Sequence, residues 1–180
     1  MKRLLCIVGG MNAGGAETFL MKIYREMDRT QFQMDFAVAT ANKCYYDDEI
    51  ISMGGRIYKI SPKSSGIVRN FNSIKELVRR EKYAYVLRTS QHSLSALELF
   101  AARMGGAKTT IFRSSNSNTT TGAGKDLLLH RICRFMPLWN ANIRLAPSTE
   151  AAEFMFGRNC VKNGRALLLH NAIDLSVFHY

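Results

Sequence analysis

The sequence predicts an α/β domain of Rossmann-like, three-layer α/β/α architecture with a mainly parallel sheet. Short apolar runs with strand character alternate along the chain with longer segments whose apolar residues recur at helical spacing. Alternation of this kind, without an internal repeat, is typical of parallel strands joined by right-handed helical crossovers. A chain of 180 residues, of which 47% are hydrophobic, is long enough to build the core of one such domain.

Seven strands are expected from apolar runs that end in glycine, proline or polar residues. Their ranges are 4–8, 34–39, 56–60, 83–88, 109–113, 142–146 and 165–169. Six helices are expected between them from apolar residues spaced three and four apart. Their ranges are 16–27, 45–53, 67–80, 92–104, 125–136 and 149–156.

Stop and start signals support these boundaries. Gly54-Gly55 ends the second helix, and Ser61-Pro62 closes the third strand. Ser148 is placed to cap the last helix, Glu150 complements that helix dipole, and Gly157 follows its last turn. The Ser-, Asn-, Thr- and Gly-rich stretch 114–124 predicts a surface loop.

The charge balance points to anionic partners. The chain has 25 Lys and Arg against 14 Asp and Glu, a net charge of +11, which favours phosphates, nucleic acid or an acidic membrane face. Because the basic residues are scattered, nucleic acid is disfavoured. Simple solubility, or charge balanced by a further domain, explains the excess equally well.

Composition also bears on location and metals. The four cysteines form no Cys-x-x-Cys pair and no Cys/His cluster with zinc spacing, so no metal site and a reducing cytosol are expected. Five apolar residues before Gly9 are too few for a signal-peptide core. No run approaches the ~20 apolar residues of a membrane-spanning helix. We expect a cytoplasmic protein, soluble or peripheral at the inner face of the membrane.

The glycine-rich loop at 9–17 is the strongest local signal. It lies between a strand and a helix, where residues without a Cβ bring bare backbone amides toward a phosphate or a sugar hydroxyl. Gly14 and Gly15 are the candidates for approach to a donor phosphate or sugar. A tight turn without a ligand is the alternative. The spacing matches neither Gly-x-Gly-x-x-Gly nor a Walker loop, which disfavours a dinucleotide or P-loop site.

Two later strands end in similar polar sequences. Arg88 and Ser90 close one, and Arg113, Ser115 and Asn116 close the other. Ligands of parallel sheets bind beyond the carboxyl ends of the strands, where an arginine fork suits phosphate or carboxylate and hydroxyls or amides suit sugars. These five residues are the candidate acceptor-binding set. The alternative is that the arginines pair with a carboxylate and the serines cap helices.

No catalytic residue is assigned from the sequence. His92 suits an acid–base role or a helix cap, and no Ser-His-Asp or Cys-His set is evident. The acidic run 47–49 is expected to be a solvated helix face. The helix at 125–136 is interpreted either as a core helix with a basic outer stripe or as a segment lying on an anionic bilayer.

Four stretches in register resemble one enzyme family. They are 9–17, 45–50 with 54–55, 146–157 and 171–178. Together they resemble the N-terminal domain of retaining glycosyltransferases of the GT-B fold, family 4, of the bacterial exopolysaccharide and capsule type. The resemblance covers nearly the whole chain.

The resemblance implies a two-domain, hexosyltransferase-type enzyme. Residues 1–175 would be the acceptor-side Rossmann-like domain and 176–180 the start of the interdomain linker, and the donor-binding C-terminal domain would be absent. The full enzyme would use a nucleotide-diphosphate sugar as donor and a glycan or lipid-linked acceptor in polysaccharide biosynthesis. No cofactor is implied in this domain, and catalysis by this chain alone is not expected.

The chain departs from the family at two strand ends. Histidines that the family often carries there align with Arg88 and Ser90, and with Arg113 and Ser115. Arginine stays charged at all working pH values, so it suits an anion better than it suits general base catalysis. A fragment of another nucleotide-binding enzyme and a non-enzymatic anion-binding module remain the alternatives.

Overall fold

A computed structural model of the protein describes residues 1–115 and 124–171. The described residues form a seven-stranded sheet, parallel throughout, in the order β3-β2-β1-β4-β5-β6-β7. The strands are β1 Lys2–Val8, β2 Phe32–Val38, β3 Ile57–Lys59, β4 Tyr85–Ser90, β5 Thr109–Ser114, β6 Ile143–Ala146 and β7 Leu167–Leu168. The helices are α1 Gly15–Glu26, α2 Asp47–Ser52, α3 Ile67–Glu81, α4 Ala96–Met104, α5 Gly124–Ile132, α6 Phe135–Asn140 and α7 Thr149–Phe156, with 3-10 turns η1 Lys63–Ser65 and η2 Ser93–Ser95. The predicted Rossmann-like architecture is confirmed.

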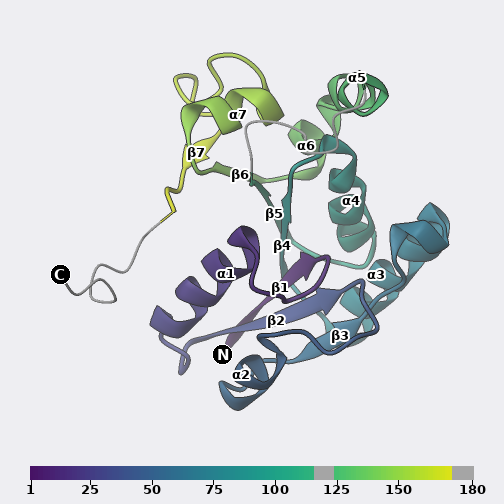
Figure 1. Ribbon diagram of the computed structural model, residues 1–180, viewed down its shortest axis with the longest axis vertical. Coiled ribbons are helices and arrows are strands. Elements are labelled where there is room, and N and C mark those ends of the chain that lie inside the picture. Colours follow the sequence, from purple (N-terminus) through teal and green to yellow (C-terminus); the bar gives the residue numbers. More distant parts are fainter. Residues whose placement is uncertain (116–123, 172–180) are drawn as a thin grey trace.

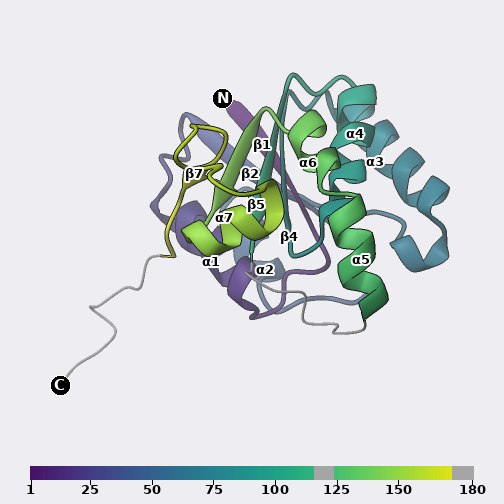
Figure 2. The same cartoon turned by 90° about the horizontal axis from the view of Figure 1, so that it is seen from above.

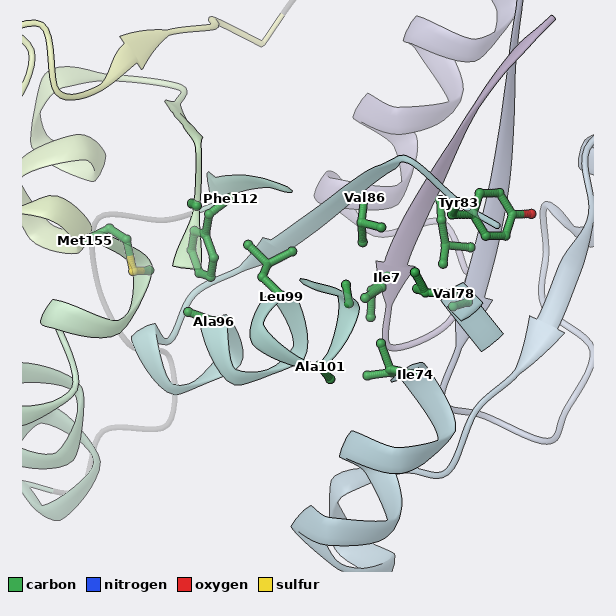
Figure 3. Close-up of a cluster of buried hydrophobic side chains, with 14 of the residues drawn as sticks. Ile7, Ile74, Val78, Tyr83, Val86, Ala96, Leu99, Ala101, Phe112 and Met155 are labelled. Carbon is green, nitrogen blue, oxygen red and sulfur yellow. The ribbon is translucent and has the colours of Figure 1, made fainter. Parts of the chain in front are cut away.

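Helices cover both faces of this sheet (Figures 1 and 2). On one face α1 and α2 pack on β1 and β2 through a cluster that includes Leu20, Tyr24 and Phe36. On the other face α3, α4 and α7 enclose a larger cluster that includes Leu99 and Phe112 (Figure 3). Right-handed crossovers produce this division, because the helices change face when the strand order reverses direction.

The strand order reverses between the central strands β1 and β4. From β1 the chain proceeds outward through β2 to β3, and from β4 it proceeds the other way through β5 to β7. The loops that leave the carboxyl ends of β1 and β4 therefore diverge. In open α/β sheets this divergence opens the crevice in which ligands bind.

Close contact between α3 and α4 depends on one glycine. A Cβ on Gly105, which follows α4, would lie 2.5 Å from the carbonyl oxygen of Lys75 and 2.9 Å from Cβ of Val78 in α3. The two helices can pack at this distance because the residue has no side chain.

In the same core cluster, Phe112 of β5 meets Phe156 of α7 edge to face, with ring centroids 6.0 Å apart.

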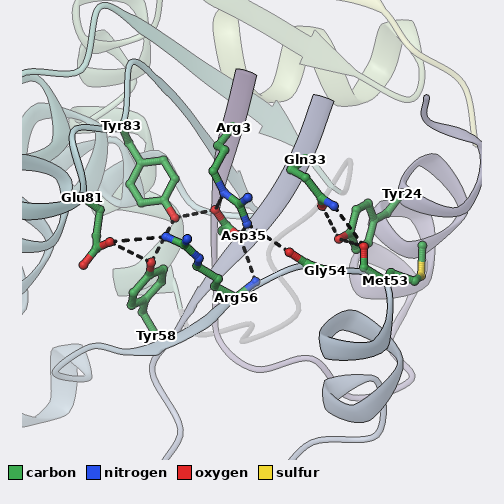
Figure 4. Close-up of polar contacts among 10 residues, drawn as sticks. All are labelled: Arg3, Tyr24, Gln33, Asp35, Met53, Gly54, Arg56, Tyr58, Glu81 and Tyr83. Carbon is green, nitrogen blue, oxygen red and sulfur yellow. Dashed lines mark hydrogen bonds and ion pairs between the residues drawn. The ribbon is translucent and has the colours of Figure 1, made fainter. Parts of the chain in front are cut away.

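A polar network holds β1, β2 and the β3 edge together away from the carboxyl ends of the strands (Figure 4). Asp35 of β2 is fully buried and accepts hydrogen bonds from the Arg3 guanidinium, two of them 2.6 Å long, and from the Arg56 backbone N–H at 2.8 Å. The Tyr83 hydroxyl also donates to this carboxylate. Burial and the Asp35 carboxylate raise the pKa of Tyr83. This network supports the fold and lies apart from the predicted ligand edge.

The structure corrects several details of the sequence interpretation. The helix expected at 125–136 is two short helices, α5 and α6. Its expected basic outer stripe is only partly right, because Arg131 is exposed but His130 is buried, and the apolar Leu128 and Ile132 are about 60% exposed. Asp47 is buried rather than solvated, since its Oδ2 accepts the Cys44 backbone N–H at 2.9 Å.

Other boundaries are confirmed with small shifts. The expected helix 92–104 begins with the 3-10 turn η2 before α4, and the apolar side chains of Phe100 and Met104 in α4 are exposed. Ser148 caps α7 as expected, because its Oγ accepts the Ala151 N–H at 3.3 Å. Gly157 follows the last residue of α7.

Candidate functional site

A polar pocket of about 530 Å³ lies at the point where the strand order reverses. Its walls come from the loop after β1, the end of β4, the end of β5 and the segment after β7. The lining residues are Gly9, Gly14, Gly15, Ala16, Glu17, Arg88, Thr89, Ser90, Gln91, Arg113, Ser115 and Asn171. Six of the seven candidates named from the sequence therefore meet in one pocket. Asn116 lies outside the described residues.

The glycine loop is fixed from behind and open in front. The Met11 carbonyl accepts the Tyr46 N–H at 2.9 Å, and Asn12 Oδ1 accepts the Tyr45 N–H at 3.2 Å, so the start of α2 holds the loop in place. A Cβ on Gly15 would meet no atom within 4 Å. The loop thus leaves space for a ligand beside the backbone.

A tight turn is present, because the Gly14 N–H donates to the Asn12 carbonyl at 2.7 Å, but its backbone angles do not require glycine. Gly14 has φ −92° and ψ 166°, an extended conformation that any residue adopts, and Gly15 is the first residue of α1 without a left-handed φ. Gly14 is the N-cap of α1, and no side-chain hydrogen bond caps the helix there. The absence of a side chain at Gly15 therefore matters for access to the first-turn amides, which carry the positive end of the helix dipole.

Arg113 is a buried cation without a carboxylate partner among the described residues. The residue is 2% exposed, its guanidinium lies 3.7 Å from the ring centre of Phe19, and its Nη2 donates to Asn171 Oδ1 at 2.6 Å. Its Nε has no acceptor within the described parts of the chain. Burial lowers the pKa of Arg113 to about 10, so the side chain remains charged at neutral pH.

Arg88 lies in a different environment. Its Nε forms an ion pair with the buried Glu98 carboxylate of α4, and its Nη1 donates to the Ile7 carbonyl at 3.0 Å. Glu98 also pairs with Lys63, with 3.4 Å between Nζ and Oε1. Burial lowers the pKa of Lys63, and the nearby Arg88 charge acts in the same direction. The structure thus gives Arg88 the carboxylate partner that the alternative interpretation anticipated.

The two serines contribute differently as well. Ser90 Oγ lies 2.9 Å from Ser95 Oγ and accepts the His92 N–H at 3.1 Å, so it caps the turn that leads into η2. The Ser115 N–H donates to the Ser90 carbonyl at 3.1 Å and continues the pairing of β4 with β5. Ser115 lies on the pocket wall.

Strand register explains why the two arginines differ. Arg88 is paired with Phe112, whereas Arg113 is paired with Thr89. Because side chains alternate between the faces of a sheet, Arg88 points toward α4 and Arg113 points toward α1. Thr89 therefore shares the face of Arg113, and its buried Oγ1 has no hydrogen-bond partner among the described residues.

Six lining residues were not among the candidates: Gly9, Ala16, Glu17, Thr89, Gln91 and Asn171. Thr89 could have been found by pairing the two strands in the register that aligns their apolar residues. Glu17 folds over Gly14 at the pocket mouth. Asn171 follows β7 far along the chain, and no local pattern indicates that it reaches Arg113.

The histidines near the pocket have structural contacts. His92 caps η2, because its Nδ1 accepts the Leu94 N–H at 3.1 Å. His130 is buried, its Nδ1 accepts the Ser93 N–H at 3.1 Å, and its Nε2 lies 3.2 Å from the Phe154 carbonyl. Burial lowers the pKa of His130, so its neutral form joins α5 to η2 and α7.

The described residues contain neither a metal-binding cluster nor a membrane-spanning helix. Across 1–115 and 124–171, no group of three or more His, Cys, Asp or Glu side chains is placed to hold a metal ion. Within the same ranges no helix is both long and apolar enough to cross a membrane.

Comparison with known proteins gives a sequence relative. No family model matches the chain. The chain is 36% identical over 183 residues to the putative glycosyltransferase EpsF of Bacillus subtilis (strain 168), and the match covers 98% of this chain and 47% of that protein. Identity at this level over nearly the whole chain shows homology. The chain spans about half the length of this curated relative.

Solved structures show the same fold. The crystal structure of Anabaena Alr3699/HepE in complex with UDP and glucose is similar with a TM-score of 0.66 at 12% identity, over 99% of this chain and 46% of that one. The apo form of the lipopolysaccharide outer core galactosyltransferase WaaB is similar with a TM-score of 0.64 at 12% identity, over 97% and 47%. At these identities the likeness shows the fold alone.

Proposed function

We propose that this chain is the acceptor-side domain of a retaining GT-B glycosyltransferase of family 4. Residues 1–175 form that domain, 176–180 begin the linker, and a donor-binding C-terminal domain completes the enzyme. The full enzyme transfers a sugar from a nucleotide-diphosphate sugar to a glycan or lipid-linked acceptor in polysaccharide biosynthesis. Homology to a putative glycosyltransferase supports the proposal, and the match covers about half of that relative's length.

The observation that carries the proposal is the composition of the pocket where the strand order reverses. The N-terminus of α1, which begins at Gly15 with no side chain beside it, lies in the same pocket as Arg113 and Ser115. Helix N-termini and guanidinium groups stabilise the negative charge that develops on a departing nucleoside diphosphate. A solved structure of the same fold holds UDP and glucose, which supports a UDP-type donor.

The chemistry places two substrates next to one another. The bond from the anomeric carbon to the diphosphate oxygen breaks, the acceptor hydroxyl oxygen forms the new bond to that carbon, and the hydroxyl proton passes to the departing nucleoside diphosphate. Retention puts the acceptor oxygen on the face from which the diphosphate departs, so the two subsites must adjoin. Gly14 and Gly15 serve the donor side. Arg113, Ser115 and Asn116 form the acceptor side, without a cofactor or a metal in this domain. Arg88 and Ser90 line the same pocket, but their contacts with Glu98 and with Ser95 and His92 give them a supporting role in its wall.

Substitution of Gly15 tests this assignment in the full-length enzyme. A valine at Gly15 meets no protein atom at its Cβ, so the fold accommodates it while the side chain occupies the space of the donor diphosphate. Gly124 is a matched control, because it also begins a helix and also has open space at its Cβ. The assay is release of nucleoside diphosphate from UDP-sugars.

Gly15→Val is expected to raise the donor KM about tenfold or more, since lost charge-assisted hydrogen bonds to an anion cost about 1.5–3 kcal/mol. Gly124→Val is expected to leave the donor KM at its wild-type value. Equal donor KM values in the two variants would exclude the glycine loop from the donor site.

The exposed face of α5 and α6 supports contact with the inner face of an anionic membrane. Leu128, Ile132, Phe135 and Trp139 are between 49% and 75% exposed, and the exposed Arg131 lies among them in sequence. The rings of Phe135 and Trp139 meet edge to face. Apolar and aromatic side chains next to a cation suit the headgroup region of acidic lipids, and such contact would bring a lipid-linked acceptor to the enzyme.

Vesicle sedimentation tests the membrane contact. The full-length enzyme is expected to sediment with vesicles that contain anionic lipid and much less with neutral vesicles. The double variant Phe135→Ser/Trp139→Ser is expected to bind anionic vesicles about a hundredfold or more weakly, because each buried aromatic side chain contributes about 1.5–3 kcal/mol. Tyr45→Ser, at another residue that is 73% exposed, is the control. Undiminished binding of the double variant would locate the contact elsewhere.

A further inference from the structure

Buried polar groups without partners gather on one wall of the pocket. Arg113 Nε and Thr89 Oγ1 are both buried without a hydrogen-bond partner in the described residues, and strand pairing places their residues side by side on the α1 face of the sheet. Buried polar atoms in folded proteins are almost always hydrogen-bonded, so two adjacent exceptions in a pocket point to a ligand.

The charge of this wall is also uncompensated. The Arg113 guanidinium has an amide and an aromatic ring as its described neighbours, Asn171 and Phe19, and neither carries a charge. Arg88, one strand away, shows how the same fold treats a structural arginine: it supplies Glu98 as a buried counter-ion. Among the described residues, Arg88, which lies outside this wall, has a counter-ion, whereas Arg113, which lines the wall, has none.

Phe19 fixes the position of this cation relative to the glycine loop. Phe19 lies four residues beyond Gly15 in α1, which is about 6 Å along the helix axis. The guanidinium that contacts its ring therefore lies beside the first two turns of α1, in the pocket that the glycine loop also lines. A substrate anion at Arg113 and a donor diphosphate at the glycine loop can occupy the pocket together.

We propose that Arg113 and Thr89 form a phosphate-binding subsite and that the acceptor is accordingly a phosphate-bearing molecule. The guanidinium donates hydrogen bonds to two phosphate oxygens and the threonine hydroxyl donates to a third. A neutral glycan has no negative charge to pair with the guanidinium. This inference rests on the proposed function for the identity of the phosphate carrier. The other source of phosphate is the donor diphosphate, and the experiment separates the two.

The experiment titrates inorganic pyrophosphate into the full-length enzyme saturated with UDP, which keeps the donor position filled. Four proteins are compared by calorimetry: wild type, Arg113→Met, Thr89→Val and the exposed-surface control Arg79→Met. Thr89→Val keeps the side-chain shape and removes a hydroxyl that has no described partner, so this variant is expected to fold. If Arg113→Met does not fold, Thr89→Val decides the outcome.

Wild type and Arg79→Met are expected to bind pyrophosphate equally. Arg113→Met is expected to bind about tenfold or more weakly and Thr89→Val about threefold to tenfold more weakly, in line with the loss of charged and neutral hydrogen bonds. UDP affinity is expected to be the same in all four proteins. Wild-type pyrophosphate affinity in both pocket variants would overturn the subsite.

The acceptor assignment and the proposed function fail in different ways. Competition between pyrophosphate and UDP, with UDP affinity reduced in Arg113→Met, would overturn the acceptor assignment and give Arg113 to the donor diphosphate. Pyrophosphate binding that depends on Arg113, in a full-length enzyme that turns over no nucleotide sugar, would overturn the proposed function and leave the anion subsite supported.

Discussion

The contrast between Arg88 and Arg113 leads to a stability prediction for two equivalent substitutions. Both residues are arginines near the carboxyl ends of adjacent strands, and both line the pocket. Replacing either with methionine removes a charge and keeps most of the side-chain volume. The two variants are nevertheless expected to differ in free energy of unfolding, because Arg88 has a buried carboxylate partner and Arg113 has none among the described residues.

The magnitudes follow from what each substitution leaves behind. Arg88→Met leaves the Glu98 side chain, 5% exposed, with Lys63 as its remaining described cation at 3.4 Å. Removing one partner of a buried ion pair costs about 3–5 kcal/mol. Because Lys63 remains beside Glu98, the expected loss of unfolding free energy is about 3 kcal/mol.

Arg113→Met leaves no described carboxylate unpaired. It loses the hydrogen bond to Asn171 and the contact with Phe19, each worth about 1 kcal/mol. These losses are offset because the charge no longer has to be buried, a cost visible in the lowered pKa of Arg113. The expected net change is less than about 1 kcal/mol.

Urea denaturation and thermal melting of the purified chain measure the difference, with Arg79→Met as an exposed control. A loss of about 3 kcal/mol lowers the melting temperature of a domain of this size by about 6–12 °C. Equal destabilisation by Arg88→Met and Arg113→Met would refute the reasoning, because it would mean that Arg113 has a counter-ion of its own or that Glu98 does not need Arg88.

Three further variants test other parts of the structure, each by chemical denaturation. Asp35→Ala leaves the half-buried Arg3 guanidinium and the buried Tyr83 hydroxyl without their acceptor and is expected to cost about 3 kcal/mol. A cost under about 1 kcal/mol would show that the network in Figure 4 contributes little. Gly105→Ala forces a Cβ against the α3 backbone and is expected to lower the free energy of unfolding by about 1–3 kcal/mol. Gly124→Ala, with open space at its Cβ, is expected to leave it unchanged. Similar free energies of unfolding for the two variants would contradict the close contact between α3 and α4. The pKa of His130 is lowered on folding, so the unfolded chain binds a proton that the folded chain does not, and stability is lost as the pH falls from about 7 to about 5. His130→Gln is expected to reduce that loss and the exposed His170→Gln to leave it unchanged; identical pH profiles for wild type and His130→Gln would contradict the assignment.

Much of the fold could be predicted from the sequence because the relevant signals are local. Alternation of apolar runs with helical periodicity predicts parallel strands joined by helices, and all seven predicted strands are present. The helix start at Ser148 was predicted from one hydroxyl and its spacing. The carboxyl ends of the strands were then the expected ligand edge, and the pocket formed by Gly14, Gly15 and Arg113 lies there.

The helix at 125–136 shows where local patterns fail. Its apolar residues suggested a buried face, yet Leu128 and Ile132 are exposed while His130 is buried. Which side of an amphipathic segment meets the core depends on the neighbours that the fold supplies, here η2 and α7. A buried histidine with both ring nitrogens close to backbone groups cannot be told from a surface histidine by its spacing alone.

The sequence by itself determined the layered architecture and the edge at which a ligand would bind, because periodicity, caps and loop composition act over a few residues. Tertiary structure alone decided the roles of the two arginines. In the register of β4 and β5, Arg113 is paired with the residue after Arg88. The two side chains therefore lie on opposite faces of the sheet, Arg88 beside Glu98 and Arg113 beside Phe19. Register and counter-ions are set by contacts between segments far apart in the chain, and burial then makes one cation structural and leaves the other charge unbalanced.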